Sequence, residues 1–142
     1  MVDSLTPEER SRMMAKIRGA NTKPELVVRS YLHRQGLRFR LHGRKLPGRP
    51  DIVLPKFNAL VFVHGCFWHR HPNCRYAYSP KSRTGFWTQK FVENVARDRQ
   101  NVDALQAAGW RVFVIWECET KSIDHLAQLT TMIRGMPDDQ HV

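Results

Sequence analysis

The feature that most constrains this fold is a short segment rich in metal-binding side chains, residues 63–74, together with one distant cysteine. The segment holds two cysteines, three histidines, a phenylalanine and a tryptophan. The third cysteine of the chain, Cys118, follows directly after an apolar run. Three thiols and one histidine form a complete tetrahedral ligand set for structural zinc. Such a site would tie two distant parts of the chain together.

The spacing favours zinc but leaves the histidine ligand open. Cys66, Cys74 and Cys118 would supply the thiols, and both Cys66-x4-His71 and Cys66-x2-His69 are acceptable spacings. Zinc with four protein ligands is closed, so the other histidine would be available for acid–base chemistry. The alternative is that the cysteines are ordinary buried thiols. Two of them flank a histidine cluster, which favours the metal.

The charge of the chain predicts a polyanionic partner. Lys and Arg number 23 against 13 Asp and Glu, a net charge of +10, and such an excess favours nucleic acid. No apolar run approaches the ~20 residues of a membrane span, and the polar, acidic N-terminus is unlike a secretory signal. An odd cysteine count is typical of a reducing compartment. We expect one cytoplasmic domain over residues 1–142 that acts as a monomer.

Two capping boxes predict the first helices. Thr6-Pro7-Glu8-Glu9 opens a helix over residues 6–18, and Thr22-Lys23-Pro24-Glu25 opens one that ends at Gly36. Alternation over residues 37–42 predicts a strand with one apolar and one basic face. Further expected elements are strands over 51–54, 59–63 and 110–116 (the last buried on both faces), a helix over 87–108 with Val92, Val95, Val102 and Leu105 inward, a helix over 123–134, and a polar tail over 135–142.

The order of these elements predicts an α/β fold. The two short apolar strands over 51–54 and 59–63 are joined by a tight connection, as in a hairpin. The helix between the third and fourth strands implies that these two strands are parallel. We therefore predict a mixed β-sheet flanked by helices.

Asp51 is a candidate ligand for Mg²⁺. If its strand and the next form a hairpin, Asp51 lies near Val63, and its carboxylate with a main-chain carbonyl would offer the hard oxygen ligands that Mg²⁺ prefers. A neighbouring histidine could take a proton from water. A turn or strand-capping role for Asp51 is about as well supported by the sequence, and Glu25 reads first as the capping-box glutamate.

Five motifs resemble the very-short-patch repair (Vsr) DNA mismatch endonucleases. They are Leu46-Pro47-Gly48-Arg49-Pro50-Asp51, residues 62–69, Phe86-Trp87, Asn94-Val95-x-Arg97-Asp98, and Gly109-Trp110-Arg111-Val112 through Trp116-Glu117-Cys118. The similarity runs from about residue 14 to residue 118. It implies a restriction-endonuclease-like fold with a structural zinc. It also implies an enzyme that nicks one DNA strand 5′ of the thymine of a T·G mismatch, the mispair left when 5-methylcytosine deaminates.

The resemblance also implies a role for each matching residue. Asp51 and the main-chain carbonyl of Val63 would bind Mg²⁺, His69 would be the general base, and Glu25 and His64 would complete the active site. Zinc would be held by Cys66, His71, Cys74 and Cys118, which resolves the histidine ligand. Phe67, Trp68 and Trp87 would wedge into the duplex beside the mismatch, with Met14 of an N-terminal DNA-contacting helix (residues 1–20) entering from the other groove. Mismatch-repair proteins are candidate partners, at the bacterial nucleoid.

The chain departs from the family at two points. Val63 stands where the family often has threonine, which a carbonyl ligand would tolerate, and residues 73–83 differ and are rich in basic side chains. The strand over 59–63 also lacks the acidic-x-Lys pair of many restriction-like nucleases, so catalysis would depend on histidine. Two rival functions remain: a sequence-specific restriction-type nuclease on matched duplex, and a zinc-stabilised DNA-binding module.

The remaining aromatic and basic residues have simpler explanations. Trp110 and Trp116 flank an apolar strand and are expected to be packing residues. Phe67 and Trp68 stand among polar ligands, where stacking on bases is plausible, although they could instead cover the zinc site. Met13 and Met14 could equally be helix core. The arginines at 38, 40, 44 and 49 are expected to contact phosphates.

Overall fold

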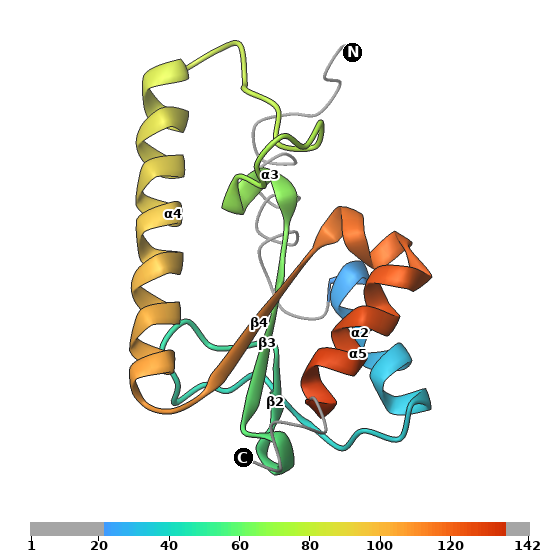
Figure 1. Ribbon diagram of the computed structural model, residues 1–142. Helices are drawn as coiled ribbons and strands as arrows, with labels where there is room; N and C mark the ends of the chain where they lie inside the picture. Colours follow the sequence, from blue (N-terminus) through green and yellow to red (C-terminus); the bar gives the residue numbers. More distant parts are fainter. Residues whose placement is uncertain (1–21, 136–142) are drawn as a thin grey trace.

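A computed structural model describes residues 22–135 as a four-stranded mixed sheet with helices on both faces (Figure 1). The elements, labelled as in Figure 1, are α2 (Lys23–Arg34), β1 (Arg40–Leu41), β2 (Ile52–Leu54), η1 (Pro55–Phe57), β3 (Ala59–His64), α3 (Cys66–His69), α4 (Thr84–Ala107), β4 (Arg111–Trp116), η2 (Glu117–Lys121) and α5 (Ile123–Arg134). The predicted helix over 6–18 with Met14, and the tail beyond residue 135, lie outside the described residues.

The predicted N-cap of α2 forms at Thr22, while the Glu25 carboxylate binds Arg29 and His42. The Thr22 side chain accepts a hydrogen bond from the Glu25 N–H at 3.4 Å, and a proline stands in the first turn of α2. Val28, Tyr31 and Leu32 form the buried stripe of the helix. Glu25 belongs to the same stripe, so its carboxylate is directed at the sheet rather than at solvent.

The sheet has the predicted topology. Its order is β1-β2-β3-β4; β2 and β3 are antiparallel, with Ile52 opposite Val61, and β3 and β4 are parallel, with His64 opposite Trp116. The connection through η1 closes with Asn58 in the left-handed region at φ 53°, which asparagine tolerates well. α4 makes the crossover that a parallel pair requires.

The two faces of the sheet carry separate apolar cores. Alternate residues of β3 divide between them, because successive strand side chains point to opposite faces. Ala59 and Val61 pack with α2 and α5, whereas Leu60 and Phe62 pack with Leu105 of α4. Figure 1 shows α2 and α5 together on one side of the strands and α4 on the other. By this alternation Val63 faces α2 and His64 faces α4.

Three expectations about local structure were wrong. The strand over 37–42 is reduced to Arg40–Leu41, both exposed, since β1 pairs only with the three-residue β2. Val92 and Val95 of α4 are 63% and 45% exposed, and Val102 is half-buried, because only Leu105 at the end of the helix reaches the sheet core. β4 is half-buried apart from Ile115, since it forms an edge of the described sheet.

The loop that leads into β2 packs against α4. Gly48 has φ +74°, and a Cβ on it would lie 2.9 Å from the Asn101 side-chain nitrogen. Only glycine fits such an approach without displacing α4. This contact fixes the chain just before Asp51. Among residues 22–135, no helix is both long and apolar enough to cross a membrane.

Candidate active site and metal centre

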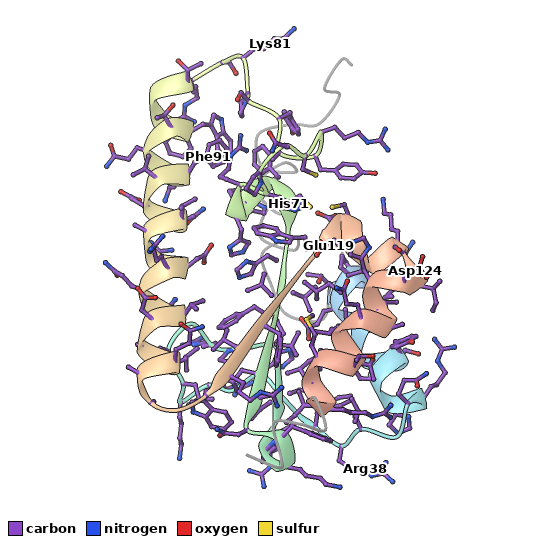
Figure 2. The ribbon with its side chains drawn as sticks, in the orientation of Figure 1. Arg38, His71, Lys81, Phe91, Glu119 and Asp124 are labelled. Carbon is purple, nitrogen blue, oxygen red and sulfur yellow. The ribbon has the colours of Figure 1, made fainter. Side chains whose placement is uncertain are left out.

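The predicted cysteine and histidine ligands meet at the ends of β3 and β4. The ligand atoms of Cys66, His71, Cys74 and Cys118 all lie within 4.8 Å of one another, and the three thiols are free of disulfides. Cys118 reaches the site because β4 runs parallel to β3 and ends beside it, as the sequence suggested. Figure 2 shows His71 at α3, close to these strand ends.

The geometry of this cluster fits zinc. His71 Nδ1 lies 3.7 Å from Cys66 Sγ and 3.4 Å from Cys118 Sγ. Two ligands at about 2.3 Å (sulfur) and about 2.0–2.1 Å (nitrogen) from one tetrahedral ion are about 3.5 Å apart. Burial raises the pKa of the Cys66 thiol to about 12, so a bound cation is needed to hold this sulfur as a thiolate.

Main-chain hydrogen bonds support the ligand loops. The Cys118 N–H donates to Cys66 Sγ at 3.4 Å, and the Cys66 N–H donates to the Glu117 carboxylate at 3.3 Å. Glu117 thereby fixes the start of α3. The segment that follows β3 is a helical turn, α3, so the side chains of His69 and Cys66 have fixed directions.

Asp51 lies beside Val63, as the hairpin argument predicted. Its carboxylate accepts a hydrogen bond from the Val63 N–H at 2.7 Å. The N–H and C=O of one strand residue point the same way, so the Val63 carbonyl faces the same edge. Continuing the β2–β3 register places Pro50 opposite Val63, and proline has no N–H to offer that carbonyl. A carboxylate and a carbonyl therefore converge at one point.

A second carboxyl group approaches Asp51 from α2. Burial, and the Glu25 carboxyl within hydrogen-bonding reach, raise the pKa of Asp51 to about 6, against the lowering effect of the Val63 N–H and of His42. Burial also raises the pKa of Glu25, but bonds from Arg29 and from His42 at 2.8 Å outweigh it and leave that pKa below its ordinary value. Two neighbouring carboxyl groups whose pKa values are shifted in opposite directions are typical of catalytic and metal sites.

His64 and His69 form a stacked pair on the α4 face. Their ring centroids are 3.9 Å apart with an interplanar angle of 5°. Burial and the neighbouring His69 lower the pKa of His64 to about 4, so His64 is neutral at physiological pH. His69 Nδ1 lies 2.5 Å from the Asp98 carboxylate. A carboxylate only accepts, so Nδ1 carries the proton and Nε2 of His69 offers a lone pair.

The possible ligand atoms of His64, His69 and Asp98 also lie within 4.8 Å of one another, close enough for one metal ion. Two ligands at about 2.1 Å from one ion and at right angles are about 3.0 Å apart. The 2.5 Å contact between His69 and Asp98 is shorter than that, so it is a hydrogen bond between a base and the group that orients it.

Asn94 and Asp98 appear in the sequence as part of a family motif, but no role was predicted for either of them. Asp98 orients His69, and Asn94 donates to the Trp68 carbonyl at 3.3 Å, so α4 supports α3 at two points. Trp87, Phe91, Asn94 and Asp98 recur at helical spacing, and this stripe was the available signal. His42 and Arg29 bind Glu25. His42 follows a strand and Arg29 lies in a helix, and because charged residues are common at both places, the sequence did not indicate their role.

The three aromatics predicted to contact DNA belong to one cluster. Phe67 contacts Trp68 and Trp87 with ring centroids 5.1 and 5.6 Å apart. Arg70 lies 3.8 Å above the Phe91 ring and donates to the carbonyls of residues 67, 77 and 78. Figure 2 shows Phe91 on the inner side of α4 in this crowd of side chains. Trp68 is only 8% exposed, whereas Phe67 and Trp87 are half-buried.

Comparisons with known proteins agree on one family and together cover most of the chain. The family described as "DNA mismatch endonuclease Vsr" matches residues 2–75. The chain is 49% identical over 138 residues to "Type II nicking enzyme V.XorIIP" of Xanthomonas oryzae, covering 97% of this chain and 98% of that protein. It is 41% identical over 126 residues to "DNA mismatch endonuclease Vsr" of Escherichia coli, covering 89% of this chain and 80% of that protein. This chain therefore belongs to the Vsr family of DNA endonucleases.

Proposed function

We propose that this chain is a Mg²⁺-dependent DNA mismatch endonuclease that nicks one strand 5′ of the thymine of T·G mismatches and so initiates very short patch repair. Two observations carry the proposal: the Asp51 carboxylate binds the Val63 N–H near the end of β3, and the His69–Asp98 pair lies at the turn that follows β3. Such a grouping supplies both a hard metal ligand and a base, and one relative is named a mismatch endonuclease.

Asp51 and the main-chain carbonyl of Val63 would hold Mg²⁺. Two features support this fit. The raised pKa of Asp51, with a second carboxyl group in reach, suits a carboxylate that acts beside a cation. Pro50 has no N–H that could bind the Val63 carbonyl, so this oxygen is left for the ion. The bound ion would polarise the scissile phosphate and lower the pKa of a water molecule. Valine at position 63 serves as well as threonine in this role, since only its backbone is used.

His69 would act as the general base. Its Nδ1 is held by Asp98, which leaves Nε2 to accept the proton of the attacking water. His64, neutral and stacked on His69, keeps that ring in one orientation. Glu25, bound by Arg29 and His42, keeps a negative charge beside Asp51, and this charge favours occupation of the site by a cation.

Zinc at Cys66, His71, Cys74 and Cys118 would act as a structural element within a restriction-endonuclease-like fold. A closed tetrahedral site has no open position for substrate. Its role would be to fix α3, which carries His69 together with Phe67 and Trp68. Loss of the metal should therefore abolish activity by disordering this turn.

Mismatch selectivity would come from the aromatic cluster. Phe67, Trp68 and Trp87, with Met14 from the other groove, would wedge between base pairs, and such unstacking costs least beside a mispair. Phe67 and Trp87 are the more accessible members, with Trp68 packed beneath them. The net charge of +10 would hold the duplex through its phosphates. We expect a monomer that acts on chromosomal DNA at the nucleoid in the bacterial cytoplasm, with mismatch-repair proteins as candidate partners.

A nicking assay on a panel of duplexes tests the proposal. The panel carries T·G mismatches with varied flanking bases and the matched duplexes, each with and without Mg²⁺. We expect a single nick 5′ of the mismatched thymine, only with Mg²⁺ and only in some flanking contexts. Equal cleavage of matched duplex would instead support a sequence-specific restriction-type nuclease. Binding without any cleavage would support a zinc-stabilised DNA-binding module.

A further inference from the structure

Trp116 stands between the metal centre and the histidine pair. It is opposite His64 in the parallel register of β3 and β4, so both side chains lie on the α4 face. The edge of one ring faces the other, with centroids 5.2 Å apart and an angle of 73°. The indole also stacks on His71, with centroids 4.3 Å apart and an angle of 13°.

These contacts continue to His69, the proposed base. His64 stacks in turn on His69, and His69 is hydrogen-bonded to Asp98. A chain of four rings therefore runs from the cysteine–histidine cluster to the base. Contacts between flat rings prefer particular orientations, so a displaced ring would displace its neighbours.

The backbone of Trp116 is itself fixed. Its N–H donates to the Glu119 carboxylate at 2.9 Å, and two residues on the Cys118 N–H donates to Cys66 Sγ. Figure 2 shows Glu119 where β4 ends and η2 begins, next to the region that holds His71. The indole therefore has a fixed backbone and contacts two flat rings, those of His64 and His71.

We propose that Trp116 is a positioning residue that holds the His64–His69 pair in its catalytic orientation against the metal-binding turn at His71. Simple core packing, which the sequence suggested, does not require the ring-to-ring contacts of the indole with both His64 and His71. Trp110, which directly precedes β4, packs against the apolar core on the α4 face and is the matched case of a packing tryptophan. The inference rests on the proposed catalytic role of His69.

The test compares Trp116→Leu and Trp116→Phe with Trp110→Leu. For each zinc-loaded protein, zinc content, urea unfolding, the histidine ring signals in NMR, and the kcat and KM for nicking a T·G duplex are measured. Leucine at 116 should leave zinc bound, shift the ring signals of His64 and His69, and lower kcat about 10–100-fold at unchanged KM. Phenylalanine, which keeps a flat ring, should restore most of the wild-type ring signals and most of kcat. Trp110→Leu should lower stability and leave signals and kcat unchanged.

Unmoved histidine signals and an unchanged kcat in Trp116→Leu would overturn the inference. If that variant fails to fold, Trp116→Met, which fills the space without a flat ring, decides the question by the same measurements. The NMR result does not depend on nicking. A His69→Ala enzyme that still nicks would therefore defeat the proposed catalytic role, whereas unmoved ring signals would defeat the role of Trp116 alone.

Discussion

Replacing Asp51 with asparagine should make the protein more stable while it destroys activity. Asparagine has nearly the same shape and keeps an oxygen that can accept the 2.7 Å bond from the Val63 N–H. It removes only the negative charge. Because burial and the Glu25 carboxyl raise the pKa of Asp51 from 3.8 to about 6, the folded protein holds this charge at a cost.

The size of that cost follows from the pKa. A difference of about two pH units at about 1.4 kcal/mol each gives about 3 kcal/mol, an upper limit since the site is partly open to water. The folded state binds the proton more tightly than the unfolded chain, so Asp51 costs nothing below about pH 4. The free energy of unfolding then falls as pH rises to about 6 and stays lowered above it.

His64 contributes with the opposite sign. Burial lowers its pKa from 6.5 to about 4, so the unfolded chain binds this proton more tightly and stability rises with pH across that interval. A pH profile of the wild-type protein alone would therefore combine two opposing slopes. Both proteins keep His64, so the difference between wild type and Asp51→Asn isolates the carboxylate.

The assay is urea unfolding of zinc-loaded protein from pH 4 to pH 8 without Mg²⁺. At pH 8 the asparagine variant should be more stable by about 1–3 kcal/mol, and the advantage should shrink toward zero at pH 4. Asp103→Asn, an exposed aspartate on α4, serves as the control and should change little. An asparagine variant that is no more stable at pH 8, or whose advantage is the same at every pH, would refute the reasoning.

Three further substitutions test other parts of the site. Asp98→Asn should lower the single-turnover nicking rate about 10–100-fold without weakening DNA binding; an unchanged rate would mean that His69 is oriented by something else. Cys74→Ser should lose zinc and nicking together, as measured by metal analysis beside the assay, with no recovery in excess Mg²⁺; full activity in a zinc-free protein would exclude the scaffold role. Gly48→Ala should lower the free energy of unfolding by about 1–2 kcal/mol, and removing the Asn101 side chain as well should recover part of it; a neutral Gly48→Ala would show that the loop moves freely.

Local sequence patterns predicted the helices and strands well wherever the residues within an element determine its structure. The capping box at Thr22 and the apolar runs of β2, β3 and β4 gave their positions to within a few residues. The helix between β3 and β4 correctly implied a parallel pair. That inference in turn brought Cys118 next to Cys66, although 52 positions separate them in the chain.

Periodicity failed where residues 22–135 provide no partner surface. Val92 and Val95 of α4 have the spacing of a buried stripe, yet the sheet lies against the far end of the helix, at Leu105. Likewise, alternation over residues 37–42 could not show that β1 would pair along only two residues. In both cases the missing information was the extent of a neighbouring element.

The polar support of the site was beyond the sequence for a different reason. Asp98 stood in a family motif without a predicted role, and His42 is an ordinary residue for a strand end; only the tertiary fold brings them to His69 and Glu25. For Asp51, the sequence supported a turn residue and a metal ligand about equally. Its contact with Val63 and its raised pKa are properties of the assembled sheet.

The most direct test of the account is single-turnover nicking of a T·G duplex by wild type, Asp51→Ala and His69→Ala, with zinc content and DNA affinity measured on the same preparations. The account predicts that both variants keep zinc and DNA binding and lose the nicking rate by at least about 100-fold. Nicking at near the wild-type rate in both variants would contradict the central claim that the carboxylate and the histidine at the end of β3 perform the chemistry.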